Sequence, residues 1–284
     1  MTDQGQMFPG KQFISTVLDA LDAKTQMSGG LARVYVMRAA MAGAIIGIMY
    51  LTHFSVVATF SEIGDGELAG IGRLVGSLFF GFALVFIYFS KSELLTSNMM
   101  FVAVGGYFRR LTWLRSLRVL ALCYAGNFVG GLAIALFVMG SSIGSGNVGE
   151  QMSAAVDHKL AYVSVGPAGW SDLFIRAILC NLMINLAMVL VYNGMINDAV
   201  TKSLAMIVSV FVFAFVGFEH SVANTVLFTM VGLTQGIDVL LALGNLGIVL
   251  VGNFVGGGLL IGFYYAYAND DRRYLRNQSK YAPK

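Results

Sequence analysis

The stretch Phe218-Glu219-His220-Ser221-Val222-Ala223-Asn224 places a glutamate and a histidine between two apolar runs, 204–217 and 225–233. A membrane-spanning helix needs about 20 apolar residues, so neither run is long enough alone, whereas both runs with the polar insert are. This pattern predicts one membrane helix that is interrupted in the middle. Ionisable residues at membrane depth usually mark an ion or substrate path, and interrupted backbone there must be buried or line a cavity.

The same device occurs earlier, where Ser92-Glu93-Leu94-Leu95-Thr96-Ser97-Asn98 interrupts the apolar run 74–104. In each half the sequence Gly-Asn-Phe-Val-Gly-Gly follows the glutamate by 33 residues, at 126–131 and at 252–257. Both motifs therefore recur at an offset of 126, which indicates an internal duplication. Paired interrupted segments in two halves are typical of a transport site near the bilayer midplane.

Composition places the chain in the membrane, because 57% of its 284 residues are hydrophobic and only 12% are charged. A soluble domain carries about 25% charged residues. Six membrane segments are expected, at 34–56, 70–104, 114–140, 172–193, 203–233 and 242–267. Three segments per repeat would make the second copy enter the membrane from the opposite side, as an inverted three-plus-three repeat.

The distribution of lysine and arginine predicts the orientation. With both termini in the cytoplasm, the cytoplasmic stretches hold 14 of the 18 basic residues, namely Lys11, Lys24, Arg33, Arg38, Arg109, Arg110, Arg115, Arg118, Lys202, Arg272, Arg273, Arg276, Lys280 and Lys284. We therefore expect a multi-pass protein of the cell (cytoplasmic or inner) membrane. Its parts would be a cytoplasmic N-terminal segment 1–30, a channel domain 31–268 and a basic cytoplasmic tail 269–284.

Within the N-terminal segment, Phe13, Val17 and Leu21 recur at helical spacing, which predicts an amphipathic helix on the membrane surface or on the protein.

The region 141–170 is the longest expected soluble piece. Cys123 and Cys180 fall in membrane segments and are expected to be core residues. The three histidines lie in different segments, so neither a metal nor another cofactor is expected. Nothing in the pattern suggests nucleic acid as a partner.

Three motifs together resemble the formate/nitrite transporter family. They are Phe-Glu-His-Ser-Val-Ala-Asn at 218–224, Ser-Glu-Leu-Leu-Thr-Ser at 92–97 and Gly-Asn-Phe-Val-Gly-Gly-Gly at 252–258. The resemblance covers residues 30–267. It implies an all-α, aquaporin-like protomer of six helices that assembles as a homopentamer with one pore per protomer. It also implies passage of small monovalent anions of weak acids, such as formate, nitrite or hydrosulfide.

The resemblance also assigns residues to the pore. His220 matches the family's central histidine, and three residues match the loop that closes the pore beside it, namely Leu94, Leu95 and Thr96. Four residues match apolar constrictions on either side of the histidine: Phe80, Leu84, Ile184 and Phe213. Asn181 matches a polar pore-facing position, and Lys159 matches a basic residue of the outer vestibule. Lys91 is a departure from the family pattern and would add a second cation if it faced the pore.

Moving a charged anion from water into an apolar constriction costs a large desolvation free energy, whereas the neutral acid passes easily. Histidine suits that proton step, because its reference pKa is about 6.5. Half-helix N-termini near Asn98 and Asn224 would favour an anion, and these two asparagines fit as N-caps. Glu93 and Glu219 are expected to hold the loop backbone.

The sequence bears on three alternatives to a formate channel: another anion of the same kind, a membrane-embedded enzyme, and a water or glycerol channel. The motifs do not separate formate from nitrite or hydrosulfide. A membrane-embedded enzyme using Glu219 and His220 as acid and base lacks a His-Glu-x-x-His motif or paired catalytic carboxylates. A water or glycerol channel would carry Asn-Pro-Ala loops, but the three prolines lie outside the interrupted stretches, at Pro9, Pro167 and Pro283.

Overall fold

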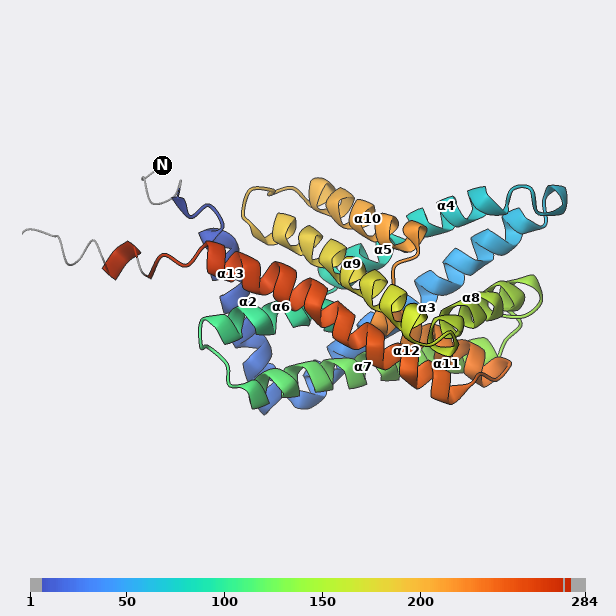
Figure 1. Cartoon of the computed structure of the whole chain (residues 1–284), viewed down its shortest axis with the longest axis horizontal. Helices are drawn as coiled ribbons and strands as arrows, with labels where there is room; N and C mark the ends of the chain where they lie inside the picture. The colour runs from blue at the N-terminus through green and yellow to red at the C-terminus, as the bar shows by residue number, and fades with distance from the viewer. Residues whose placement is uncertain (1–6, 273, 277–284) are drawn as a thin grey trace, which may run out of the picture.

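The computed structural model describes residues 7–272 and 274–276, so most of the predicted basic tail lies outside the described residues. The chain folds into helices throughout (Figure 1). In order they are α2 (Lys11–Gly30), α3 (Ala32–Ser61), η1 (Gly64–Gly66), α4 (Ala69–Phe80), α5 (Phe82–Phe89), α6 (Leu95–Tyr107), α7 (Trp113–Met139), α8 (Asn147–Ser164), α9 (Pro167–Tyr192), α10 (Ala199–Val216), α11 (Ser221–Thr234), α12 (Val239–Asn253), the π-helical η2 (Phe254–Phe263) and α13 (Tyr264–Ala268).

Six helical stretches are long and apolar enough to cross a membrane, as the sequence predicts. They are Ala32–Ser61, Ala69–Phe89, Trp113–Met139, Pro167–Tyr192, Ala199–Val216 and Val239–Ala268. Helix α10 begins at Ala199, earlier than expected, and is long enough without α11. Helix α11 has 14 residues and would be only about 21 Å long, too short to span the hydrocarbon core.

The interruptions lie at the two duplicated polar stretches, and the chain turns out of the preceding helix in the same way at both. Helix α10 ends at Gly217, which has φ +83°, and Phe218 N donates to Phe213 O at 2.9 Å. In the first copy Lys91 takes the position of Gly217, with φ +57°, and Ser92 N donates to Ile87 O at 3.0 Å. The left-handed conformation is the ordinary way to end a helix, but it favours glycine.

The two halves pack their helices through glycines of the duplicated motif. A side chain at Gly130 of α7 would collide with the backbone of Ala40 in α3, and one at Gly256 of η2 would collide with the backbone of Ile178 in α9. These glycines therefore set a close approach between α3 and α7 in the first half and between α9 and η2 in the second. That approach leaves the interrupted stretches in the interior of the molecule.

Helix α2 lies on the protein, because Phe13, Val17 and Leu21 are all 1% exposed or less. It packs at the end of the molecule that also holds α13 (Figure 1). There Gly10 N donates to Asn269 Oδ1 at 2.6 Å. The region expected to be the longest soluble piece contains the helix α8, which is not among the six candidate spans and buries Met152, Val156 and Leu160.

Candidate functional site

His220 is fixed by both of its ring nitrogens at the start of α11. Its Nδ1 accepts a hydrogen bond from Ala223 N at 3.1 Å, so His220 itself is the N-cap of this helix. Its Nε2 lies 3.1 Å from the hydroxyl oxygen of Thr96, the second residue of α6. Because Nδ1 accepts, the neutral ring carries its proton on Nε2. The Nε2–H group therefore donates a hydrogen bond to the hydroxyl oxygen of Thr96. The two duplicated stretches thus meet at one hydrogen bond between buried side chains.

A small apolar cavity lies against this histidine. We call the segments between α5 and α6 (90–94) and between α10 and α11 (217–220) the two linkers. The lining combines Leu94 and His220 of these linkers with residues from α3, α4, α5, α9, α10 and α11. It consists of Ile46, Phe80, Ala83, Leu84, Ile87, Leu94, Ile184, Val210, Phe213, His220 and Ala223. The cavity volume is about 20 Å³, which is enough for one water-sized molecule. The Phe213 ring stacks on the His220 ring at 5.8 Å, and the Phe80 ring meets Phe213 edge-on at 6.2 Å. The imidazole is therefore the only polar side chain among the described residues that line this space.

Two asparagines of the duplicated Gly-Asn-Phe-Val-Gly-Gly motif hold the linkers in place. Asn127 Nδ2 donates to the carbonyls of Ala39 and Glu93, both at 2.8 Å, and its Oδ1 accepts from Leu95 N at 3.0 Å. Asn253 repeats this arrangement and contacts Ala177 O (2.8 Å), Glu219 O (2.9 Å) and Ser221 N (2.9 Å). The recurrence of this motif was predicted from the sequence as a sign of duplication, but this role of its asparagines was not. The invariant spacing of each asparagine from its glutamate was the available signal.

The glutamates of the two linkers are neutralised by lysines from distant helices. Both Glu219 oxygens accept from Lys159 Nζ at 2.8 Å, and Asn224 Nδ2 donates to Glu219 Oε2 at 2.6 Å. In the first copy, Lys24 of α2 forms an ion pair with Glu93, and Asn98 donates to the same carboxylate at 3.1 Å. Such pairing is required because an isolated buried carboxylate is very costly.

Two expectations about these groups need correction, those for the asparagines and the glutamates. Lys159, which the resemblance assigns to the outer vestibule, has a side chain that is 13% exposed and belongs to α8. Burial by itself would lower the pKa of Lys159, but the charge and hydrogen bonds of Glu219, together with Tyr50 and Cys180, outweigh burial and raise this pKa. Asn98 and Asn224 are not N-caps, because the N-cap positions are Leu94 and His220. The glutamate side chains bind the lysine and asparagine side chains, and the linker backbone is held by the motif asparagines instead.

A model of the formate/nitrite transporter family matches residues 11–267, which is most of the chain. The chain belongs to the formate/nitrite transporter family. It is 30% identical over 252 residues to the formate channel FocA of Haemophilus influenzae, covering 80% of this chain and 85% of that protein. It is 29% identical over 233 residues to the nitrite transporter NirC of Salmonella typhimurium, covering 81% of each protein. These relatives are named channels or transporters and not enzymes.

Solved structures show the same fold for this member of the formate/nitrite transporter family. A structure described as an FNT family ion channel superposes with a TM-score of 0.77 at 26% identity, covering 92% of this chain and all of the other. A pentameric formate channel with formate bound superposes with a TM-score of 0.67 at 23% identity, covering 83% of this chain and 96% of that one. The all-α fold with six candidate spans and its multi-pass membrane class are thereby established.

Six of the ten residues assigned from the family resemblance line the cavity, and four do not, namely Leu95, Thr96, Asn181 and Lys159. Leu95 is buried but does not line the cavity, where Leu94 faces instead. Asn181 is also absent from the lining: its Nδ2 donates to Thr96 O at 3.1 Å and to Asn253 O at 2.7 Å. It therefore ties the start of α6 to the end of α12.

Proposed function

We propose that this protein is a selective channel for small monovalent anions of weak acids, with formate as the first candidate substrate. The observation that carries the proposal is the His220–Thr96 hydrogen bond at the edge of an otherwise apolar cavity of about 20 Å³. This space suits a small molecule with one polar end. Nitrite is the second candidate, favoured by the similarity to a nitrite transporter, and hydrosulfide is the third.

The proposed passage is linked to a proton. An anion would be expensive to carry past Phe80, Leu84 and Phe213, because apolar walls cannot replace its hydration. The Nε2–H of His220 would donate a hydrogen bond to the anion while a proton from bulk water neutralises it, and Thr96 would provide a second hydrogen-bonding group. The permeating species would then be the neutral acid across the constrictions, and His220 would keep its own Nε2 proton, because a neutral imidazole that gave it up would become an imidazolate. Charge on the lysine–glutamate pairs would stay at the two ends of this path.

Reconstitution of the purified full-length protein into vesicles tests this proposal. Flux of labelled formate, nitrite and hydrosulfide is measured with and without a pH gradient. His220→Asn should lower formate flux at least about ten-fold, because a hydrogen bond to a charged group contributes about 1.5–3 kcal/mol and each 1.36 kcal/mol is about ten-fold in rate, and should alter the pH profile. His158→Asn is the matched control, because His158 is exposed on α8 and contacts Tyr162 instead of the cavity. A correctly assembled His220→Asn protein with the flux and pH profile of the parent would remove the histidine from the mechanism.

The proposal extends to assembly and orientation. We infer a homopentamer with one pore per protomer, because the similar solved channel is described as pentameric. We also infer both termini on the cytoplasmic side of the cell's inner membrane, from the asymmetry of basic residues. Native mass spectrometry from detergent reports the first. A reporter fused after Lys284 that is active only outside the cytoplasm would refute the second.

A further inference from the structure

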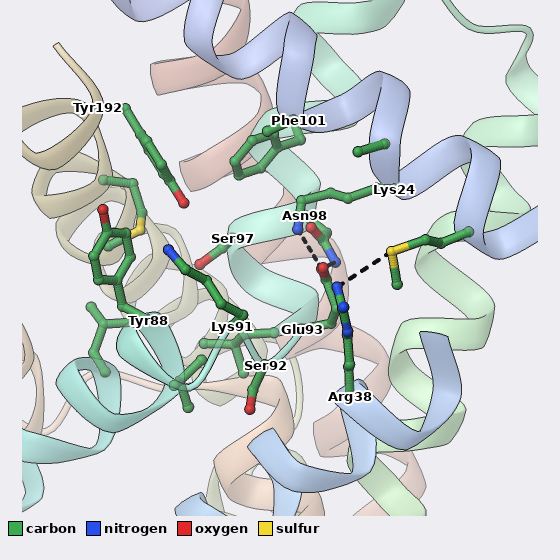
Figure 2. Close-up of a pocket in the computed structure, with 17 residues that line it drawn as sticks. Lys24, Arg38, Tyr88, Lys91, Ser92, Glu93, Ser97, Asn98, Phe101 and Tyr192 are labelled. Atoms are coloured by element: carbon green, nitrogen blue, oxygen red, sulfur yellow. Dashed lines mark hydrogen bonds and ion pairs between the residues drawn. The ribbon is translucent and has the colours of Figure 1, made fainter. Parts of the chain in front are cut away.

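A larger pocket lies beside α2, on the other side of Leu94 from the apolar cavity. We call it the α2-side pocket; its volume is about 360 Å³, and its charged lining residues are Lys24, Arg38, Lys91 and Glu93 (Figure 2). Lys24 and Glu93 neutralise one another as an ion pair. The lining described for this pocket therefore has a formal surplus of two positive charges, carried by Arg38 and Lys91.

The backbone at Lys91 shows that this lysine occupies a position suited to glycine. Its φ is +57°, a conformation that is unfavourable for a residue with a Cβ. The corresponding residue of the second repeat, 126 positions later, is Gly217, with φ +83°. Non-glycine residues held in this region cluster at functional sites, where the side chain is needed. The Lys91 ammonium lies 5.1 Å from the centre of the Tyr88 ring and projects into the α2-side pocket (Figure 2).

Arg38 differs in the same sense from Arg176, which is its structural counterpart because Glu93 N donates to Arg38 O and Glu219 N donates to Arg176 O. The Arg176 guanidinium already has partners, since its Nε donates to Asp172 at 2.8 Å and its Nη1 donates to Gly217 O at 2.9 Å. Arg38 has no ion pair with any described residue, and its guanidinium contacts the sulfur of Met27 at 3.4 Å. The first repeat thus presents an arginine without a carboxylate beside a lysine in a strained backbone position, whereas the second repeat presents neither.

We propose that Arg38 and Lys91 form a binding site for a dicarboxylate in the α2-side pocket. The two cations enter the pocket from different elements, α3 and the linker after α5, on either side of the Lys24–Glu93 pair (Figure 2). Two cations without a carboxylate partner match the two charges of a dicarboxylate, whereas a single monovalent anion would compensate only one of them. The hydroxyl of Ser97 also lines the pocket and provides a further hydrogen-bond donor.

Such a ligand would stop at this site. A doubly charged molecule would have to give up two hydrated charges to enter the apolar cavity, which has about 20 Å³ against the pocket's 360 Å³. Because Leu94 lines both spaces, an occupant of the α2-side pocket would stand across the entrance to the cavity. Provided that the proposed transport function holds, a dicarboxylate would therefore block flux from this side.

Calorimetric titration of the full-length protein in detergent tests the site without relying on transport. Succinate should bind at least about five-fold more tightly than acetate at low ionic strength, the effect of about one additional charge contact in a solvated pocket. Lys91→Gly and Arg38→Gln should each weaken succinate binding by a similar factor, whereas Lys91→Arg should retain it. Lys91→Gly installs the residue of the second repeat, so it is compatible with the fold.

Arg109→Gly is the matched control, because Arg109 is an exposed cation that also has φ +57° but lies outside the α2-side pocket. Succinate affinity that is equal in the parent, Lys91→Gly and Arg38→Gln proteins, or reduced equally by Arg109→Gly, would overturn the proposal. Vesicle flux then separates the two hypotheses. Charge-dependent succinate binding without formate or nitrite flux would refute the transport function alone. Flux without charge-dependent binding would refute the dicarboxylate site alone.

Discussion

Replacement of Asn253 by alanine should destabilise the protein strongly, because this one side chain holds the backbone on both sides of the His220 linker. The carboxamide bonds to Ser221 N, Glu219 O and Ala177 O at 2.8–2.9 Å, and Asn253 is 0% exposed. Leaving a buried polar group unsatisfied costs about 1–3 kcal/mol. Three such groups give a loss of roughly 3 kcal/mol or more, even if the linker relaxes in part.

The matched control is Asn147→Ala in α8. Asn147 Nδ2 also makes three contacts, to Ala58 O, Ser61 Oγ and Glu62 Oε1 at 3.0–3.1 Å, but it is only partly buried. Water can replace the lost asparagine there, so its loss should cost only about 0.5–1.5 kcal/mol. The comparison therefore tests burial, because Asn147 makes more side-chain hydrogen bonds than Asn253, including one that its Oδ1 accepts from Gln151 Nε2 at 3.2 Å, yet should cost less to remove.

A thiol-reactive fluorescent dye provides the assay, because Cys123 and Cys180 are both free and fully buried and would react only on unfolding. The unfolding midpoint should fall by several degrees more for Asn253→Ala than for Asn147→Ala. The Asn253→Ala protein that remains folded should also lose formate flux, because Ser221 N has lost its acceptor and the start of α11 is no longer anchored. Equal midpoints for the two variants would refute the argument that Asn253 holds the linker.

Three further outcomes are expected. Lys159→Met should destabilise the protein by about 3–5 kcal/mol because it leaves the buried Glu219 carboxylate unpaired, and adding Glu219→Gln should restore part of the loss in the same dye assay. Leu94→Ala should enlarge the cavity and raise lactate flux relative to formate, whereas the neighbouring Leu95→Ala should leave the ratio unchanged; identical ratios in both variants would place selection elsewhere. The pKa of Asp270 is lowered to about 2 by hydrogen bonds from an arginine two residues later. The stabilisation from this carboxylate is therefore full above its ordinary pKa of 3.8 and lost as the pH falls through about 2, so Asp270→Asn should flatten the dependence of the unfolding midpoint over that range.

Much of the architecture was predictable because it depends on local properties of the chain. The length of an apolar run decides whether a helix can cross a bilayer, so the number of spans follows from the sequence, although the second and the fifth end at Phe89 and Val216 instead of at the expected 104 and 233. The break at Gly217 was visible because polar residues and glycine stand inside an apolar run. The offset of 126 identified His220 and the Glu93 stretch as related parts of one site before any contact was known.

Tertiary structure alone decided which side chains meet. Lys24 lies 69 residues before Glu93, and Lys159 lies 60 residues before Glu219, so no local pattern pairs them. Whether Leu94 or Leu95 faces the cavity depends on where the extended linker passes into α6, which is fixed by the distant Asn127. Apolar periodicity indicates that a residue is buried. In a chain whose helices are apolar on most faces, however, it does not indicate which residues pack against that position. The rotation of each helix about its axis, and with it the composition of the site, is set by close glycine contacts and buried hydrogen bonds between halves that are far apart in sequence.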